Sequence, residues 1–143
     1  MTKQTLNILI GDDEFKDFLT ERIFKQNYVR QLQDQTPGYE LNWRYETDSQ
    51  SVIREAITGT YEIVVTDLDY SGGGRGKEGY EVIDMISRMN PRPLLILCTS
   101  CDNDKEIEER TGGKIDFRAG GARKGHKFSD LVEILSKHLN KTK

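Results

Sequence analysis

Acidic residues follow two apolar runs of this sequence, and their type and spacing are suited to chemistry. Residues 6–10 form an apolar run that is followed, after one glycine, by the adjacent pair Asp12 and Asp13. A second run, residues 63–66, leads directly into Asp67. A carboxylate at the end of a strongly apolar strand is costly to bury, so a functional site explains Asp67 better than a turn does.

A hydroxyl residue and a lysine occupy the corresponding places after two later segments. Residues 94–98 form an apolar run that leads into Thr99, and the stretch 114–124, which we interpret as containing a short final strand, ends at Lys124. Loops beyond the carboxyl ends of parallel strands converge at one edge of a sheet. We therefore expect Thr99 and Lys124 to lie beside the acids. If the strands end elsewhere, the alternatives are Ser100 or Cys98 for the hydroxyl and Lys127 for the amine.

These groups together favour phosphoryl chemistry at a metal ion. Clustered carboxylates repel one another, so either their pKa values rise or a divalent cation lies among them. Mg²⁺ is the natural occupant, because it takes oxygen ligands and keeps waters that phosphoryl oxygens can replace. A carboxylate that attacks a phosphoryl group needs the negative charge balanced, and a metal ion and a lysine provide that balance. Asp67 is the best-placed nucleophile.

The elements that must position these residues alternate along the whole chain between apolar runs and amphipathic segments. Strands are expected at residues 6–10, 40–45, 63–66, 94–98 and within 114–124. Helices are expected from residue 15 to about residue 37, and over residues 48–57, 82–89, 104–110 and 131–139. This alternation predicts an α/β fold with a five-stranded parallel sheet and helices on both faces.

Some segments also support expectations about burial and capping. In the first helix, four large apolar residues fall at helical spacing and predict a shared face: Phe15, Phe18, Leu19 and Ile23. The alternation of residues 40–45 predicts a half-buried strand near the edge of the sheet. Ile107 is the only aliphatic anchor of its helix, which we expect to be lightly held and easily displaced. Ser129 or Asp130 is the expected cap of the last helix.

Length and composition narrow the classes of protein further. The 143 residues, with 35% hydrophobic and 31% charged, predict one folded domain over residues 1–143. No apolar stretch approaches the roughly 20 residues of a membrane span, so we expect a cytoplasmic protein without membrane contact. The net charge of −3 gives no electrostatic reason for direct binding of nucleic acid. Two cysteines, Cys98 and Cys101, are too few for a disulfide framework.

The order of the motifs along the chain is DDE, VVTD, a small hydroxyl residue and K-G. This order resembles the receiver domain of bacterial response regulators, and the resemblance covers nearly the whole chain. It implies a flavodoxin-like (βα)5 fold with strand order 2-1-3-4-5. The loop at residues 71–79 is longer and richer in glycine than is usual in that family.

The resemblance also implies a role for each acidic residue. Asp12 and Asp13 would position Mg²⁺, and Asp67 would contact the ion and accept the phosphoryl group as an aspartyl phosphate. Asp69, two residues further on, would offer its backbone carbonyl to the metal. Such a phosphoprotein promotes its own phosphorylation without being a conventional turnover enzyme.

The remaining roles and the partners follow from the same resemblance. Thr99 would hydrogen-bond a phosphoryl oxygen, and Lys124 would pair with the acyl phosphate. The phosphodonor would be a phosphohistidine on a histidine kinase or a histidine phosphotransfer protein, docked near the first helix. Output in this two-component system would pass to a downstream effector protein or continue as a phosphorelay.

Two other functions fit parts of the sequence. The string VVTDLDYS resembles the first motif of haloacid-dehalogenase-type phosphatases, in which Asp67 would be the nucleophile and Asp69 the general acid and base. Those enzymes place their metal-binding acid pair downstream of the nucleophile, whereas Asp12 and Asp13 lie upstream, so the order favours the receiver. The third possibility is a pseudo-receiver, which keeps the fold but binds its partner without phosphate.

Overall fold

A five-stranded parallel sheet forms the centre of the molecule. The computed structural model describes residues 3–70, 77–121 and 126–141. In the order β2-β1-β3-β4-β5, every neighbouring pair of strands is parallel, which confirms the expected sheet and strand order. The strands are β1 (Gln4–Gly11), β2 (Tyr39–Glu46), β3 (Ile63–Thr66), β4 (Leu94–Cys98) and β5 (Phe117–Ala119).

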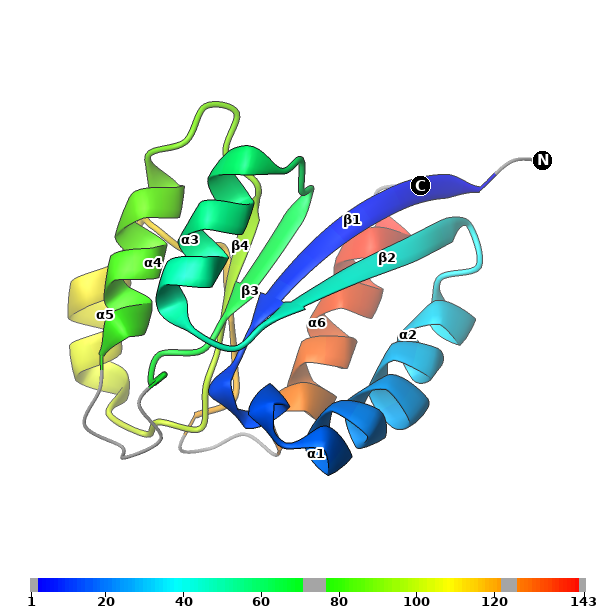
Figure 1. The fold of residues 1–143 in the computed structure, drawn as a ribbon. Coiled ribbons are helices and arrows are strands. Elements are labelled where there is room, and N and C mark those ends of the chain that lie inside the picture. Colours follow the sequence, from blue (N-terminus) through cyan, green and yellow to red (C-terminus); the bar gives the residue numbers. More distant parts are fainter. Residues whose placement is uncertain (1–2, 71–76, 122–125, 142–143) are drawn as a thin grey trace.

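Helices cover both faces of this sheet, as expected. Figure 1 shows α1, α2 and α6 on one side of the sheet and α3, α4 and α5 on the other. The α-helices are α1 (Phe18–Ile23), α2 (Arg30–Gln35), α3 (Ser49–Thr58), α4 (Glu78–Ser87), α5 (Asp104–Thr111) and α6 (Lys127–Lys141). None of the helices in the described ranges is both long enough and apolar enough to cross a membrane.

The first helical segment is divided into several parts. A 3-10 turn, η1 (Asp13–Lys16), precedes α1, and a π-helical stretch, η2 (Phe24–Val29), joins α1 to α2. The backbone stays helical at both junctions, because Ile23 and Val29 keep right-handed helical dihedrals. The result is one long helix with a wider turn in its middle, between β1 and β2.

Two apolar layers hold the helices against the sheet. Successive side chains of a strand point to opposite faces, so each central strand contributes to both layers. In β3, Ile63 and Val65 pack toward α6, whereas Val64 packs toward α3 and α4. All four residues of β3 are buried. The strand that leads into Asp67 is therefore held from both sides.

The edge position expected for residues 40–45 is confirmed, because β2 pairs with β1 alone. Its side chains are partly buried in alternation, and Trp43 lies edge-on to Phe24 with ring centroids 5.5 Å apart. This aromatic contact ties the π-helical stretch to the sheet.

The expectation of one apolar face in the first helix is wrong. Phe15 is buried, but Phe18, Leu19 and Ile23 expose 70%, 62% and 51% of their surface. The reason is a new helix start: the Asp17 side chain accepts a hydrogen bond from Leu19 N at 3.1 Å and caps α1. Phe15 therefore belongs to a separate turn, and the helical spacing is broken.

The expected cap of the last helix is also wrong, because α6 already begins at Lys127. Asp130 lies inside the helix, and its backbone N donates to His126 O at 3.0 Å. Its carboxylate instead accepts a hydrogen bond from Gly120 N at 2.8 Å, which joins the end of β5 to α6. In α5, Ile107 is buried as expected and makes the main apolar contact of that helix.

Candidate functional site

The carboxyl ends of β1 and β3 bring three carboxylates together. The two strands are neighbours in which Gly11 lies opposite Thr66, so the residues that follow each strand lie side by side. The backbone N of Asp67 donates to Gly11 O at 2.9 Å and continues this pairing. One carboxylate oxygen from each of Asp12, Asp13 and Asp67 lies within 4.8 Å of the others.

A buried tyrosine, Tyr70, is linked to Asp67 through Thr66, and sequence reasoning missed it. Thr66 Oγ1 donates to Asp67 O at 2.8 Å, so the Tyr70 hydroxyl, 2.7 Å away, must be the donor to Thr66. A Cβ at Gly11 would lie 2.4 Å from the Tyr70 hydroxyl, so glycine is needed there. The available sequence signal was the alternation after the strand, where the apolar Leu68 and Tyr70 follow Asp67 and Asp69.

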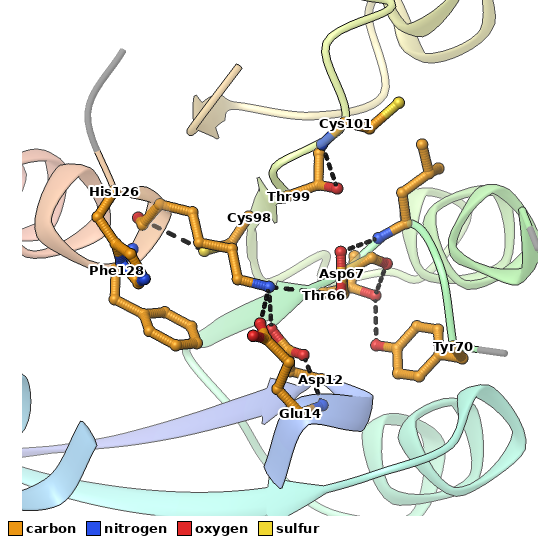
Figure 2. A network of polar contacts seen from close by, with 12 residues as sticks. Asp12, Glu14, Thr66, Asp67, Tyr70, Cys98, Thr99, Cys101, His126 and Phe128 are labelled. Carbon is orange, nitrogen blue, oxygen red and sulfur yellow. Dashed lines mark hydrogen bonds and ion pairs between the residues drawn. The ribbon is translucent and has the colours of Figure 1, made fainter. Parts of the chain in front are cut away.

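Lys127, the second candidate lysine, lies against the carboxylates. Its Nζ lies 2.6 Å from Asp12 Oδ2, 2.5 Å from Glu14 Oε2 and 3.5 Å from Asp67 Oδ2. In Figure 2, dashed lines join the Asp12 and Glu14 carboxylates to one nitrogen atom, that of this lysine. Lys124, the first candidate, lies outside the described residues.

A sharp turn after β5 leads toward this lysine. Gly120 has a φ of +85°, and a Cβ there would lie 2.2 Å from Thr99 O and 3.0 Å from Lys127 Cβ. A residue with a side chain would be strained at this φ and would collide with the Thr99 carbonyl. The close approach keeps the end of β4, the end of β5 and the start of α6 together.

Glu14 is a second residue that the sequence did not single out. Its carboxylate reaches Lys127 although half of its side chain is exposed. Its backbone N donates to Asp12 Oδ1 at 2.9 Å, so the acid pair and Glu14 form one turn. The sequence signal for Glu14 was its place as the third residue of the DDE motif.

A cavity of about 510 Å³ opens above the carboxylates and contains the other predicted residues. Thr99 is buried in its wall, and its Oγ1 accepts a hydrogen bond from Cys101 N at 3.2 Å. Asp69 also lines the cavity. Among the alternatives for Thr99, Ser100 lines the cavity but is exposed, whereas the Cys98 sulfur faces Lys127 O at 3.7 Å.

Burial dominates the electrostatics of the carboxylates. It raises the pKa of Asp12 to about 7, and the neighbouring Asp67 adds to that effect. Burial also raises the pKa of Asp67, against the opposing charge of Lys127. The pKa of Asp13 rises because of burial and then because of the charges of Asp67 and Asp69. Burial alone would lower the pKa of Lys127, but the carboxylates outweigh it and raise that pKa.

One buried ammonium therefore faces an excess of carboxylates. Hard oxygen donors from three side chains, close enough to share one ion, suit a small divalent cation such as Mg²⁺. The raised pKa values also favour a cation, because its positive charge would offset the cost of burying these carboxylates and the repulsion that Asp12 and Asp13 receive from Asp67. The two cysteines have no comparable setting: both are free, and burial raises the pKa of Cys98 well above its usual value.

Comparison with known proteins identifies the fold. No protein-family model matches the sequence, and a search among curated proteins also finds no match. Among solved structures, the receiver domain of the Francisella response regulator 1452 is similar with a TM-score of 0.68 at 14% identity, over 96% of this chain and 99% of that one. The chain has the receiver-domain fold.

Other structures with the receiver fold extend the comparison. The BeF3-activated receiver domain of DrrB matches with a TM-score of 0.62 at 18% identity, over 96% of this chain and 97% of that one. The response regulator DrrB from Thermotoga maritima has a TM-score of 0.66 at 18% identity over 98% of this chain. The response regulator RcsB in its complex with DNA has a TM-score of 0.65 at 22% identity over 98% of this chain. This chain spans 55% of the DrrB chain and 62% of the RcsB chain.

The raised pKa of Asp12 predicts an unusual pH dependence of stability. Its pKa rises from 3.8 to about 7 on folding, so between these pH values the folded protein binds more protons than the unfolded chain. The free energy of unfolding should then fall as the pH rises through this window. Asp12→Asn removes that loss and should stabilise the metal-free protein at pH 7.5 by about 2 kcal/mol. Urea unfolding in EDTA at pH 5 and pH 7.5 measures both quantities, and equal pH slopes for the two proteins would contradict this account.

Proposed function

We propose that this chain is one two-component receiver domain that takes a phosphoryl group from a phosphohistidine donor onto Asp67 in a Mg²⁺-dependent reaction. The observation that carries the proposal is the meeting of Asp12, Asp13 and Asp67 with the Lys127 ammonium at the carboxyl edge of the sheet. The receiver fold supports it independently.

The metal would be held by the side chains of Asp12, Asp13 and Asp67 and by the backbone carbonyl of Asp69. When bound, Mg²⁺ supplies positive charge beside the phosphoryl oxygens. The mutual distances of the three carboxylates and their raised pKa values support this assignment.

In the transfer, a carboxylate oxygen of Asp67 forms a bond to phosphorus while the bond from phosphorus to the donor nitrogen breaks. The donor imidazole leaves with the electron pair of that bond, and the product is an acyl phosphate on Asp67. Leu68 N donates to Asp67 Oδ1 at 2.7 Å, which orients the carboxylate before the reaction. The other oxygen, Oδ2, faces Lys127.

Two side chains are placed to stabilise the phosphoryl oxygens. The Thr99 oxygen accepts from Cys101 N, and its hydroxyl hydrogen-bonds the Asp67 carboxylate, so after transfer the same proton would donate to a phosphoryl oxygen. Lys127 would move from Glu14, which is half exposed, toward the new negative charge on Asp67. Both contacts would be stronger in the phosphorylated state than before transfer.

The proposed donor is a histidine kinase or a histidine phosphotransfer protein. The exposed apolar residues of α1 offer a surface for it, because α1 follows the η1 turn that contains Asp13. Output would pass to an effector protein or to a further phosphotransfer. The net charge of −3 supports a role without direct nucleic-acid contact. The proposed location is the cytoplasm.

Phosphorylation by a small donor tests the proposal. With acetyl phosphate and Mg²⁺, the wild-type protein should gain one phosphoryl group on Asp67, seen by intact mass and peptide mapping as a base-labile adduct. EDTA should prevent labelling, because the metal balances the charge at the site. Asp67→Asn should not be labelled.

The other outcomes of that experiment favour other functions. Full labelling of Asp67→Asn would refute the assignment of the nucleophile. Repeated turnover of small phosphate esters would favour a phosphatase with Asp69 as acid and base, and no modification would favour a phosphate-independent binding module.

The two lysine candidates are separated by a pair of matched variants. Lys127→Ala should slow phosphorylation by acetyl phosphate at least about tenfold, because the developing charge loses its buried ammonium. Its affinity for Mg²⁺, followed by titration of the unphosphorylated protein, should rise, since a competing positive charge is gone. Lys124→Ala should remain within about twofold of wild type in both measurements. The reverse pattern would assign the pocket amine to Lys124.

A further inference from the structure

Lys77 is a second cation at the cavity that the proposed reaction does not use. It lies immediately before α4 and lines the same cavity as Asp67 and Thr99. Its Nζ is 2.6 Å from Glu106 Oε1 in the first turn of α5. About half of the Lys77 side chain, 46%, and 31% of the Glu106 side chain are exposed. An ion pair at such exposure holds weakly and is exchanged at low cost.

Glu106 keeps other partners if Lys77 leaves it. Asn103 caps α5: its Oδ1 accepts from Glu106 N at 3.3 Å, and its Nδ2 donates to Glu106 Oε2 at 3.1 Å. Arg110 lies 3.8 Å from the Glu106 carboxylate, one helical turn further along. The negative charge of Glu106 is therefore still compensated without the lysine, and the bond from Lys77 is replaceable.

The excess of negative charge in the cavity would attract the Lys77 ammonium toward Asp67. Among the described residues that line it, Lys77 and Lys127 are the cations, against five acids: Asp13, Glu14, Asp67, Asp69 and Asp102. Lys127 already pairs with the buried Asp12 as well. Phosphorylation replaces the single charge of the Asp67 carboxylate with about two negative charges on the acyl phosphate at neutral pH. Even with a divalent ion bound, the negative charges then exceed the positive ones, and Lys77 is the remaining cation among the described residues that line the cavity.

We propose that Lys77 is a phosphate-binding residue of this site, and that phosphorylation transfers its ammonium from Glu106 to the phosphoryl oxygens on Asp67. The inference rests on the proposed function and adds a residue to it. The exchange breaks the ion pair between Lys77, just before α4, and Glu106 in the first turn of α5. It thereby links the chemistry at Asp67 to α5, the helix whose main apolar anchor is Ile107.

A phosphoryl analogue tests the proposal without turnover. Beryllofluoride, formed from beryllium chloride and fluoride, is titrated with Mg²⁺ into the wild-type protein and its variants, and binding is followed by backbone amide NMR shifts. Lys77→Gln should bind it about fivefold more weakly, as expected for loss of one partly solvated charge contact. Lys77→Arg should recover most of the loss. Glu106→Gln should bind more tightly than wild type, because it releases Lys77.

Arg110→Gln is the matched control. Arg110 pairs with the same Glu106 carboxylate but does not line the cavity, so this variant should bind within about twofold of wild type. Unchanged binding by Lys77→Gln, or an equal loss in Arg110→Gln, would overturn the role of Lys77.

The titration of the wild-type protein distinguishes failure of the proposed function from failure of the role of Lys77. If wild type binds beryllofluoride at Asp67 and Lys77→Gln binds it equally well, the proposed function stands and this inference fails alone. If wild type does not bind it at all with Mg²⁺ present, both fail together.

Discussion

The structure depends on one buried ionic arrangement, in which the Lys127 ammonium faces the Asp12 and Asp67 carboxylates at the edge of the sheet. All three side chains are nearly removed from water. Buried charges are tolerated only when they are paired and held in place. Within the described part of the chain the pairing is incomplete, because carboxylates outnumber the ammonium. The site therefore favours binding of a further cation. The fold must hold the acids close together against their repulsion.

The required rigidity comes from packing on both sides of the acids. The strand β3 is buried on both faces, and its last residue, Thr66, is hydrogen-bonded to the Tyr70 hydroxyl. That hydroxyl fits against Gly11 only because glycine has no side chain. On the other side of the sheet, Phe128 follows Lys127 and packs against two rings of the first helical segment. Its ring centroid is 5.7 Å from that of Phe15 and 4.8 Å from that of Phe24. The backbone that carries the ammonium is thus anchored in the same aromatic cluster that seats the π-helical stretch on the sheet.

How much of this was predictable depends on how local each signal is. The strands at residues 63–66 and 94–98 were predicted with their observed ends, because a continuous apolar run bounded by turn residues is a local pattern. The acids at the ends of β1 and β3 followed from the apolar runs at residues 6–10 and 63–66 that precede them. The approach of Lys127 to the acids did not, since it depends on the turn at Gly120, which has no periodic pattern.

Other features were out of reach because they arise only in three dimensions. The new start of α1 is set by a side-chain cap at Asp17, which overrides the helical spacing of the apolar residues around it. The support from Tyr70 and the ion pair of Lys77 with Glu106 join residues whose proximity no local pattern encodes. A sequence can therefore indicate which carboxylates meet, while the groups that support and balance them are seen only in the folded structure.

The central claim, that these acids form one metal-dependent phosphoacceptor site, is tested most directly by a crystal structure with Mg²⁺ and beryllofluoride. The account predicts an ion at about 2.1 Å from carboxylate oxygens of Asp12, Asp13 and Asp67, beryllium bonded to Asp67, and the Lys127 ammonium turned toward the fluorines. An ion bound elsewhere, or beryllofluoride away from Asp67 in a site whose three carboxylates point apart, would contradict it.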